Sequence, residues 1–381
     1  MKHVLLTVGM YVVVTAAHAQ SNPLALKQHA YGGSMGDWFN SMCLTKDGGC
    51  VMGGGSNSND GDATGNHGQN DYWIVKAGAT GTTQWTKSLG GSLIEWQHDV
   101  QQTKDGGYIV AGESYSNDSN VSGNHGTQDA WIVKLNATGN IQWQRSLGGS
   151  DYDYANCVRQ TNDGGYIVGG STYSKDGDVS GNHGQSDMWI VKLDASGNIQ
   201  WQKCFGGTKR EFASSIRQTK DGGYIIAGSS GSVNGDVTVN HGLSDYWIIK
   251  LDASANIQWQ KSFGGTNDEN AKCVEQITDG SYIVAGYCNS ADGDINDHHG
   301  VIKNDDYWVL KLDTSGNIQW KKSFGGSRSD DAFSIKQTKD KGYIIAGESF
   351  SLDGDVTGQH SVGYSDFWVV KTDGLGNIQW Q

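Results

Sequence analysis

The sequence predicts an all-β protein, a six-bladed β-propeller with four antiparallel strands in each blade. A unit of 58 to 61 residues is written six times, and its closing tryptophan recurs as Trp85, Trp143, Trp201, Trp259, Trp320 and Trp380. A turn aspartate keeps the same period independently, as Asp47, Asp105, Asp163, Asp221, Asp279 and Asp340. Repeats of this length indicate a propeller or a solenoid. Two hairpin turns per copy favour the propeller over a parallel β-solenoid, whose coils are usually shorter.

The third copy shows how each strand is predicted in order. A first strand over about 154–161 ends at the Asp-Gly hairpin signal of Asp163-Gly164. A short apolar second strand over 166–170 leads into a loop of roughly 16 residues, far longer than most connections. The third strand covers 188–193, and the turn at Gly197-Asn198 leads into the fourth strand over 199–205. The glycine content, 56 of 381 residues with a single proline, suits tight turns between strands that form ladders.

Each copy places one tryptophan on its third strand and one on its fourth. The third-strand set is Trp73, Trp131, Trp189, Trp247, Trp308 and Trp368. Large aromatic residues on sheets that pack face to face are core residues by default. We therefore expect both sets to pack between blades.

The repeated motifs resemble a known family. The chain repeats GGS-x-x-D, then D-G-G-Y-I-V-A-G, then D-x-W-I-V-K-L-D-x-x-G-N-I-Q-W, and closes each copy on F-G-G. This pattern is similar to the bacterial β-propeller repeats called SBBP, as found in secreted, type IX secretion-associated proteins of Bacteroidetes. The resemblance covers residues 32–381. It implies a propeller fold and export, and it carries no catalytic motif because the family shares none.

The N-terminus reads as an export signal. Lys2 and His3 precede an apolar run that reaches about Ala17, and Ala17-His18-Ala19 fits the small-x-small cleavage rule. The run is too short for a membrane span. We expect a signal peptide at 1–19 and a secreted chain, extracellular or periplasmic. The predicted domains are an N-terminal segment at 20–31 that supplies a closing strand, and a propeller at 32–381 with repeats 32–89, 90–147, 148–205, 206–263, 264–324 and 325–381.

Charge and cysteine content limit the partners. The formal net charge is −13 and no basic stripe is present, which argues against nucleic acid and anionic membranes as partners. We expect a monomer that meets a glycan or a protein on a cell surface. Export permits disulfides, and of the six cysteines only Cys43 and Cys50, which flank the first tight turn, are placed for one.

Propeller geometry puts the long loops and the Gly-Gly links on one face, where loops on a rigid scaffold carry function. One acid precedes the body of each first strand: Asp37, Glu95, Asp153, Glu211, Glu269 and Asp330. Six such acids in a ring would repel one another and attract a cation or a cationic ligand group. Alternatively, each acid caps its Gly-Gly turn by accepting backbone N–H bonds, the reading that we favour.

The long loops carry a second acidic motif. Its clearest copies pair Asp60 with Asp62, Asp176 with Asp178, Asp292 with Asp294 and Asp353 with Asp355, each around one glycine. Oxygen ligands around a glycine bend suit calcium. The motif is shorter than an EF-hand loop and lacks its bidentate glutamate, so a plain Asx turn without metal is the favoured alternative.

Each long loop also carries one histidine with an aspartate a few residues later. The histidines are His67, His125, His183, His241, His299 and His360, and their aspartates are Asp71, Asp129, Asp187, Asp245, Asp306 and Asp366. A His–Asp hydrogen bond would fasten each loop and fix the imidazole tautomer. We expect this structural role, because six-fold repetition suits a scaffold better than a catalytic or metal site.

The sequence contains no G-x-S-x-G nucleophile elbow at a strand-to-helix turn, no Walker loop, no H-E-x-x-H motif and no Cys/His nucleophile context. Departures from the repeat are the better place to look for a site: Trp38 and Trp96 after the acid, Lys209-Arg210, Arg328, and the insert from His298 to Asp305. Trp38 and Trp96 would stack on sugar rings or plug the central channel. The sequence thus favours a non-catalytic binding module; a glycan-acting hydrolase or lyase that uses the ring of acids is the alternative.

The ends of the chain yield a prediction about ring closure. The sixth fourth-strand lacks the Lys-Ser-Phe tail of the other copies, and Leu24–Tyr31 precede the first Gly-Gly where that tail belongs. We expect this segment to join the last blade. Deletion of residues 20–31 should then lower the melting temperature by several degrees, measured by thermal denaturation. An unchanged melting temperature would rule out this closure.

Overall fold

Two of the four predicted strands in each copy are rich in apolar residues, and these become the central strands of a sheet. In the third copy every residue of Tyr166–Thr172 and Asp187–Leu193 is buried. The fourth strand, Ile199–Phe205, passes from exposed to buried along its length. Continuous burial is typical of strands covered on both faces, and mixed burial is typical of an edge strand.

The computed structural model describes residues 29–300, 304–360 and 363–381. The chain divides into two compact units at the boundary between Leu147 and Gly148, where the third repeat begins. The first unit contains two antiparallel sheets, blade 1 and blade 2. Their strands are β1 (Asp37–Leu44), β2 (Cys50–Ser56), β3 (Asp71–Ala77) and β4 (Thr83–Leu89) in blade 1, and β5 (Glu95–Gln102), β6 (Tyr108–Ser114), β7 (Asp129–Leu135) and β8 (Ile141–Leu147) in blade 2.

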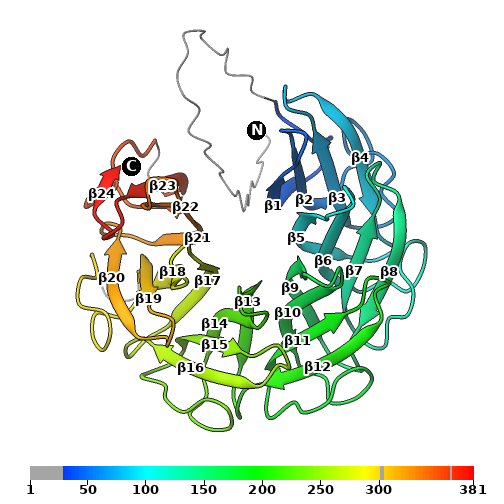
Figure 1. Cartoon of the computed structure of the whole chain (residues 1–381). Helices are drawn as coiled ribbons and strands as arrows, with labels where there is room; N and C mark the ends of the chain where they lie inside the picture. The colour runs from blue at the N-terminus through cyan, green and yellow to red at the C-terminus, as the bar shows by residue number, and fades with distance from the viewer. Residues whose placement is uncertain (1–28, 301–303, 361–362) are drawn as a thin grey trace. The chain divides into compact units, whose positions relative to one another are not determined.

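The second unit contains four more such sheets, blades 3 to 6 (Figure 1). Blade 3 has β9 (Asp153–Gln160), β10 (Tyr166–Thr172), β11 (Asp187–Leu193) and β12 (Ile199–Phe205), and blade 4 has β13 (Glu211–Gln218), β14 (Tyr224–Ser230), β15 (Asp245–Leu251) and β16 (Ile257–Phe263). Blade 5 has β17 (Glu269–Gln276), β18 (Tyr282–Cys288), β19 (Asp306–Leu312) and β20 (Ile318–Phe324), and blade 6 has β21 (Asp330–Gln337), β22 (Tyr343–Ser349), β23 (Asp366–Thr372) and β24 (Ile378–Trp380).

The predicted fold class, a six-bladed β-propeller with four antiparallel strands per blade, is confirmed. The strands predicted in the third copy agree with β9 to β12 to within two residues at each end. Within the second unit the first strands β9, β13, β17 and β21 lie next to one another in chain order, as Figure 1 shows. In the part of the chain that the structure describes, no helix is long and apolar enough to span a membrane.

The core lies between successive blades of a unit. One apolar cluster joins blades 1 and 2 around Tyr72 and Trp131, and three others join blades 3 to 6 in turn. All six third-strand tryptophans are buried, as expected. The fourth-strand tryptophans are less buried: Trp201 and Trp259 meet the rings of Tyr224 and Tyr282 in the following blade edge-on.

A buried tyrosine on some third strands links one blade to the next. The Tyr246 hydroxyl donates to the Trp308 carbonyl at 3.0 Å, and Tyr72 and Tyr307 make the same bond to Trp131 and Trp368. The tyrosine ring also lies against the partner's indole, with centroids 4.7 Å apart for Tyr246 and Trp308. These contacts fix the spacing of neighbouring sheets.

Every first strand carries a β-bulge that the sequence pattern did not predict. In β17 the pairing with β18 skips from Ala271 to Cys273, so Lys272 has no partner in the ladder. The equivalent residues of the other blades are Asn40, His98, Asn156, Ser214 and Phe333. A bulge re-aims its side chain, and bulges are frequent next to functional sites.

The tight turns between first and second strands are held by a buried lysine. Lys134 of β7, only 3% exposed, places its Nζ 2.9 Å from Asp105 Oδ2, and the Asp105 carboxylate also accepts from Gly107 N. Burial opposes ionisation of Asp105, but hydrogen bonds from Thr103 and Lys134 lower its pKa to about 2. Loss of the aspartate would leave a buried ammonium without its carboxylate, so the turn aspartates are structural.

The expectation of a disulfide between Cys43 and Cys50 is wrong in this structure, where both are free thiols. Cys43 pairs with Val51 and Leu44 pairs with Cys50, so the two cysteines occupy adjacent rungs of the ladder. Side chains on adjacent rungs point to opposite faces of a sheet, which keeps the two sulfurs apart.

The proposed closing segment lies mostly outside the described residues, since these begin at 29. Of its members, Tyr31 packs against blade 1, with its ring centroid 6.1 Å from that of Phe39. Ring closure therefore stays a prediction.

The blade-to-blade tyrosines generate a stability prediction. Tyr246→Phe removes the bond to the Trp308 carbonyl and keeps the ring, so the free energy of unfolding should fall by about 1 kcal/mol. Urea denaturation measures this. Tyr224→Phe is the matched control, because that tyrosine is equally buried and meets its neighbouring blade through the Trp201 ring. Equal losses in both variants would contradict a role for the interblade hydrogen bond.

Candidate functional site

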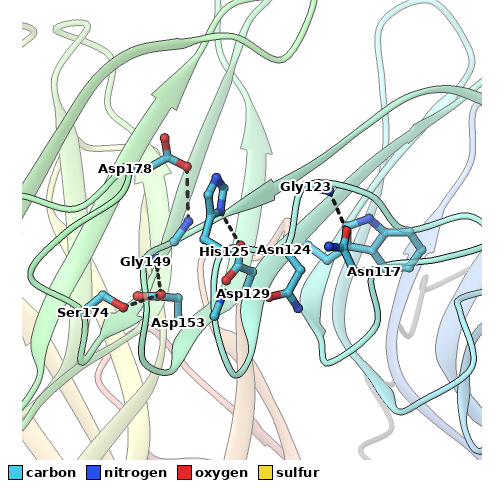
Figure 2. Close-up of polar contacts among 12 residues, drawn as sticks. Asn117, Gly123, Asn124, His125, Asp129, Gly149, Asp153, Ser174 and Asp178 are labelled. Atoms are coloured by element: carbon cyan, nitrogen blue, oxygen red, sulfur yellow. Dashed lines mark hydrogen bonds and ion pairs between the residues drawn. The ribbon is translucent and has the colours of Figure 1, made fainter.

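The six acids at the start of the first strands are hydrogen-bonded to the link that enters their own blade. Each carboxylate accepts the N–H of the second glycine of the Gly-Gly link, as Figure 2 shows for Asp153 and Gly149. The other five pairs are Asp37 with Gly33, Glu95 with Gly91, Glu211 with Gly207, Glu269 with Gly265 and Asp330 with Gly326, and all six distances lie between 2.7 and 2.9 Å. This is the turn-capping geometry favoured from the sequence.

Hydroxyl groups complete the caps. Ser114 Oγ donates to Glu95 Oε1 at 2.7 Å, and Ser174 Oγ donates to Asp153 Oδ2 at 2.8 Å. Five of the six acids are fully buried, Asp37 being the exception. Burial raises the pKa of Glu269 to about 7 and that of Asp330 to about 6, although their hydrogen bonds act in the opposite direction. Each of these acids has at least one oxygen bonded to the chain's own donors, and Asp330 Oδ1 is buried without a partner among the described residues. Their role as ligand contacts stays a prediction.

The Asp-Gly-Asp motifs of the long loops hold the same links from the other side. In blade 3, Asp176 Oδ1 accepts from Ser150 N at 2.7 Å and Asp178 Oδ2 accepts from Gly148 N at 3.3 Å. Equivalent bonds are made by Asp60 and Asp62, by Asp292 and Asp294, and by Asp353 and Asp355. Within the described ranges no group of three or more His, Cys, Asp or Glu side chains is arranged to hold a metal ion. These carboxylate oxygens accept backbone N–H bonds, whereas calcium needs six to eight oxygens directed at the ion. Calcium binding by the long loops stays a prediction.

The long loops are fastened by the His–Asp pairs. His125 Nδ1 lies 2.6 Å from Asp129 Oδ2, and the His125 backbone N–H donates to the same oxygen at 3.0 Å (Figure 2). The pair occurs in all six blades, with Nδ1–Oδ2 distances from 2.5 to 3.0 Å. Because Nδ1 faces a carboxylate, it carries the proton. The geometry is that of the expected structural clip.

The first unit holds an aromatic pair that departs from the repeat. Trp38 of β1 and Trp96 of β5 have ring centroids 5.4 Å apart with planes inclined at 36°. Trp96 is 39% exposed, and Trp38 is half-buried. Each is the second residue of its strand, so the pair lies at the end of the blades where the Gly-Gly links and long loops are found. We call it the tryptophan pair.

A charged pair accompanies these rings. His98, the bulge residue of β5, places Nε2 2.7 Å from Glu113 Oε2, and Glu113 is the register partner of Trp96. Burial lowers the pKa of His98, but the Glu113 carboxylate more than offsets this, so the net shift is upward. The Glu113 side chain is 6% exposed and that of His98 is 34% exposed.

The sequence interpretation missed His98 and Glu113. The available signal was a comparison of the same position between copies, where Asn40, Asn156 and Ser214 stand in place of His98. The repeat pattern does not mark this position as accessible to a ligand, because it does not predict the β-bulge that turns the His98 side chain out of the ladder.

Comparison with known proteins adds little beyond the fold. No protein-family model matches the chain. Over 188 residues the chain is 28% identical to the regulatory protein FlaEY of Caulobacter vibrioides, an alignment that covers 46% of this chain and 20% of that protein. The chain therefore spans about a fifth of that relative's length.

Solved structures with a similar fold are distant. A protein of unknown function from Bacteroides caccae is 14% identical with a TM-score of 0.45, covering 83% of this chain and 91% of that one. A puromycin hydrolase structure is 11% identical with a TM-score of 0.48, covering 90% of this chain and 45% of that one. Likenesses at this level carry no argument about activity.

The buried caps generate a prediction about pH. The Glu269 pKa of about 7 exceeds the ordinary 4.5, so between these values the folded chain binds more protons than the unfolded chain. The stability that this cap contributes is therefore complete below about pH 4.5 and is lost as pH rises through about 7. In Glu269→Gln the melting temperature should fall less between pH 4.5 and 7 than in the wild type.

Asp105→Asn is the control for that experiment. The Asp105 pKa is lowered to about 2, so its contribution is present above the ordinary 3.8 and is lost only as pH falls through about 2. This variant should have a lower melting temperature throughout, because Lys134 loses its carboxylate, and should alter the slope of the acid limb while the slope above pH 4.5 stays that of the wild type. Parallel wild-type and Glu269→Gln curves across that upper limb would refute the assignment.

Proposed function

We propose that this β-propeller is a secreted binding module whose tryptophan pair stacks on a glycan at the long-loop face. The observation that carries the proposal is the pair itself, two indoles on neighbouring first strands with one ring 39% exposed. A large aromatic side chain left in contact with water at a concave or loop-rich surface is typical of a recognition site. The apolar faces of sugar rings are suited to such a platform.

Polar groups beside the rings suit a glycan better than a purely apolar ligand. The His98–Glu113 pair offers an imidazole and a carboxylate within one strand register of Trp96. Asn70 reaches the same strand, since its side chain donates to the Glu95 carbonyl, next to Trp96. Sugar hydroxyls both donate and accept, and a mixed set of this kind satisfies them.

Binding is favoured over glycan hydrolysis because the acids on which a hydrolase would depend serve the fold. All six accept the N–H of a link glycine, and they are equivalent, which leaves no division between an acid and a nucleophile. Export rests on the signal-like segment at 1–19 and on the resemblance to SBBP repeats of secreted Bacteroidetes proteins. Cell-surface partners and a monomeric state are part of the same proposal.

A glycan array tests the proposal with the chain from residue 20 to 381. The wild type should bind a defined glycan class, and Trp96→Ala should lose about fivefold or more in affinity, because removal of an aromatic side chain that anchors a ligand costs roughly 1 kcal/mol or more. Leu93→Ala is the matched control, since Leu93 is a similarly exposed apolar residue of the same blade, three positions earlier. A Trp96→Ala variant that binds like the wild type would mean that the indoles merely fill space.

The same array, run with calcium and with a chelator, decides the role of the Asp-Gly-Asp loops. We expect no difference, because their carboxylates already accept backbone N–H bonds. Binding that disappears with chelator and returns with added calcium would identify the loops as calcium sites after all.

A further inference from the structure

The seam between blades 5 and 6 departs from the repeat more than any neighbouring seam of the second unit. Asp305 stands directly before the aspartate that opens β19, where the other copies have Asn70, Gln128, Ser186, Ser244 and Ser365. Asp331 is the second residue of β21, where blades 1 to 4 have Trp38, Trp96, Tyr154 and Phe212. Charges therefore replace neutral or aromatic side chains on both sides of one seam.

Backbone pairing brings these departures together. The N–H of Asp330 donates to the carbonyl of Asp305 at 2.6 Å, so Asp305 lies beside the start of β21. Asp331 pairs in register with Glu348, and Asn270 pairs with Tyr287 on the blade 5 side. We call Asn270, Lys272, Tyr287, Asp305, Asp331 and Glu348 the blade 5–6 cluster.

Lys272 supplies the one lysine of this cluster. It is the bulge residue of β17, so its side chain leaves the ladder, and its Nζ lies 5.3 Å from the centre of the Tyr287 ring. An ammonium over a tyrosine face is a cation–π contact. The cluster thus already accommodates one positive charge on an aromatic surface.

Acceptors outnumber donors here. The Oδ1 atoms of Asp305, Asp331 and Asn270 are all buried and have no hydrogen-bond partner. Burial, followed by the charges of Asp305 and Glu348, raises the pKa of Asp331 to about 7. Buried oxygens without donors are rare in native proteins and call for a partner that donates.

We propose that the blade 5–6 cluster binds an organic cation, an ammonium or guanidinium group that donates to Asp305 and Asp331 and rests near the Tyr287 ring. Guanidinium carries five donors and no acceptor, which matches a site made of orphan acceptors. A metal ion fits less well, since among the described residues no three acidic, histidine or cysteine side chains are arranged to hold one. The site is independent of the proposed glycan platform, and either can fail without the other.

Titration calorimetry with the chain from residue 20 to 381 tests this proposal. The probes are Nα-acetyl-arginine amide, an acetylated Gly-Arg-Gly amide, and the same two compounds with citrulline, which has the shape of arginine without its charge. The α-amino group is blocked in all four, so the guanidinium is the only cation, and the arginine probes should bind and the citrulline probes should not. Binding of both arginine probes indicates that a guanidinium group suffices, and binding of the peptide alone indicates a basic segment of a protein; both support the cation site. Equal binding of citrulline and arginine, or no binding at all, would overturn it.

Variants locate the site. Asp305→Asn and Asp331→Asn should each weaken binding of the arginine probes by about tenfold or more, because each removes a half-buried carboxylate that pairs with the ligand. Asp151→Asn, which removes an exposed charge in blade 3, should have little effect. If all three variants bind alike, the ligand is held by general charge and the assignment is wrong.

Lys272→Met gives a test with the opposite sign. Without the internal ammonium, the carboxylates are free for the ligand, so binding should become several-fold tighter. Lys209→Met makes the same change in net charge at an exposed position of blade 4 and should leave affinity near that of the wild type. Weaker binding in Lys272→Met, or an equal gain in both variants, would refute the proposal.

Discussion

The structure depends on the hydrogen bonding of the Gly-Gly link that leads into each four-stranded blade. In blade 3, Asp153, Asp176 and Asp178 each accept an N–H of this short link. The glycines are required by the same contacts: a Cβ on Gly149 would lie 2.4 Å from Asp176 Oδ1. Since Asp153 is buried, its carboxylate is stable there only while these donors are present. The repeated acids, glycines and hydroxyls therefore belong to one hydrogen-bonded set, and a change in any one of them disturbs the others.

This constraint distinguishes the residues that hold each link in place from the residues at positions that can vary. Residues that hold the link recur in every copy, whereas the side chains at the bulge position and directly after the capping acid vary among the copies. At the bulge, Asn156 donates to the Ala213 carbonyl of the next blade, whereas His98 pairs with the Glu113 carboxylate and Lys272 lies over the Tyr287 ring. A bulge frees a side chain from the ladder without breaking the sheet. The first strand can therefore keep its role in the fold while its exposed positions vary.

The sequence predicted the fold well because its signals are local and repeated six times. Turn glycines and continuous apolar runs placed the third copy's strands to within two residues, and the fourth strand, Ile199–Phe205, without error. The predicted disulfide between Cys43 and Cys50 is wrong in this structure because it depends on the pairing register of β1 and β2. The turn residues alone do not determine that register. His98 and Lys272 were missed for a related reason. A bulge adds one residue to a strand and so shifts the alternation of inward-facing and outward-facing side chains by one. The alternation of apolar and polar residues in the sequence does not show where that shift occurs.

The capping acids show why a motif is ambiguous before burial is known. A ring of carboxylates reads as a cation site when it is exposed and as a set of caps when it is buried. Only the structure shows Glu95 with its oxygens on Gly91 N and Ser114 Oγ. Asp331 follows the capping acid Asp330 by one residue, and it is Asp330 that accepts the N–H of the link glycine Gly326. Trp96 occupies the same position in blade 2. An indole in blade 2 and a carboxylate in blade 6 thus stand at the same position of a four-stranded blade, so the fold is compatible with either side chain there.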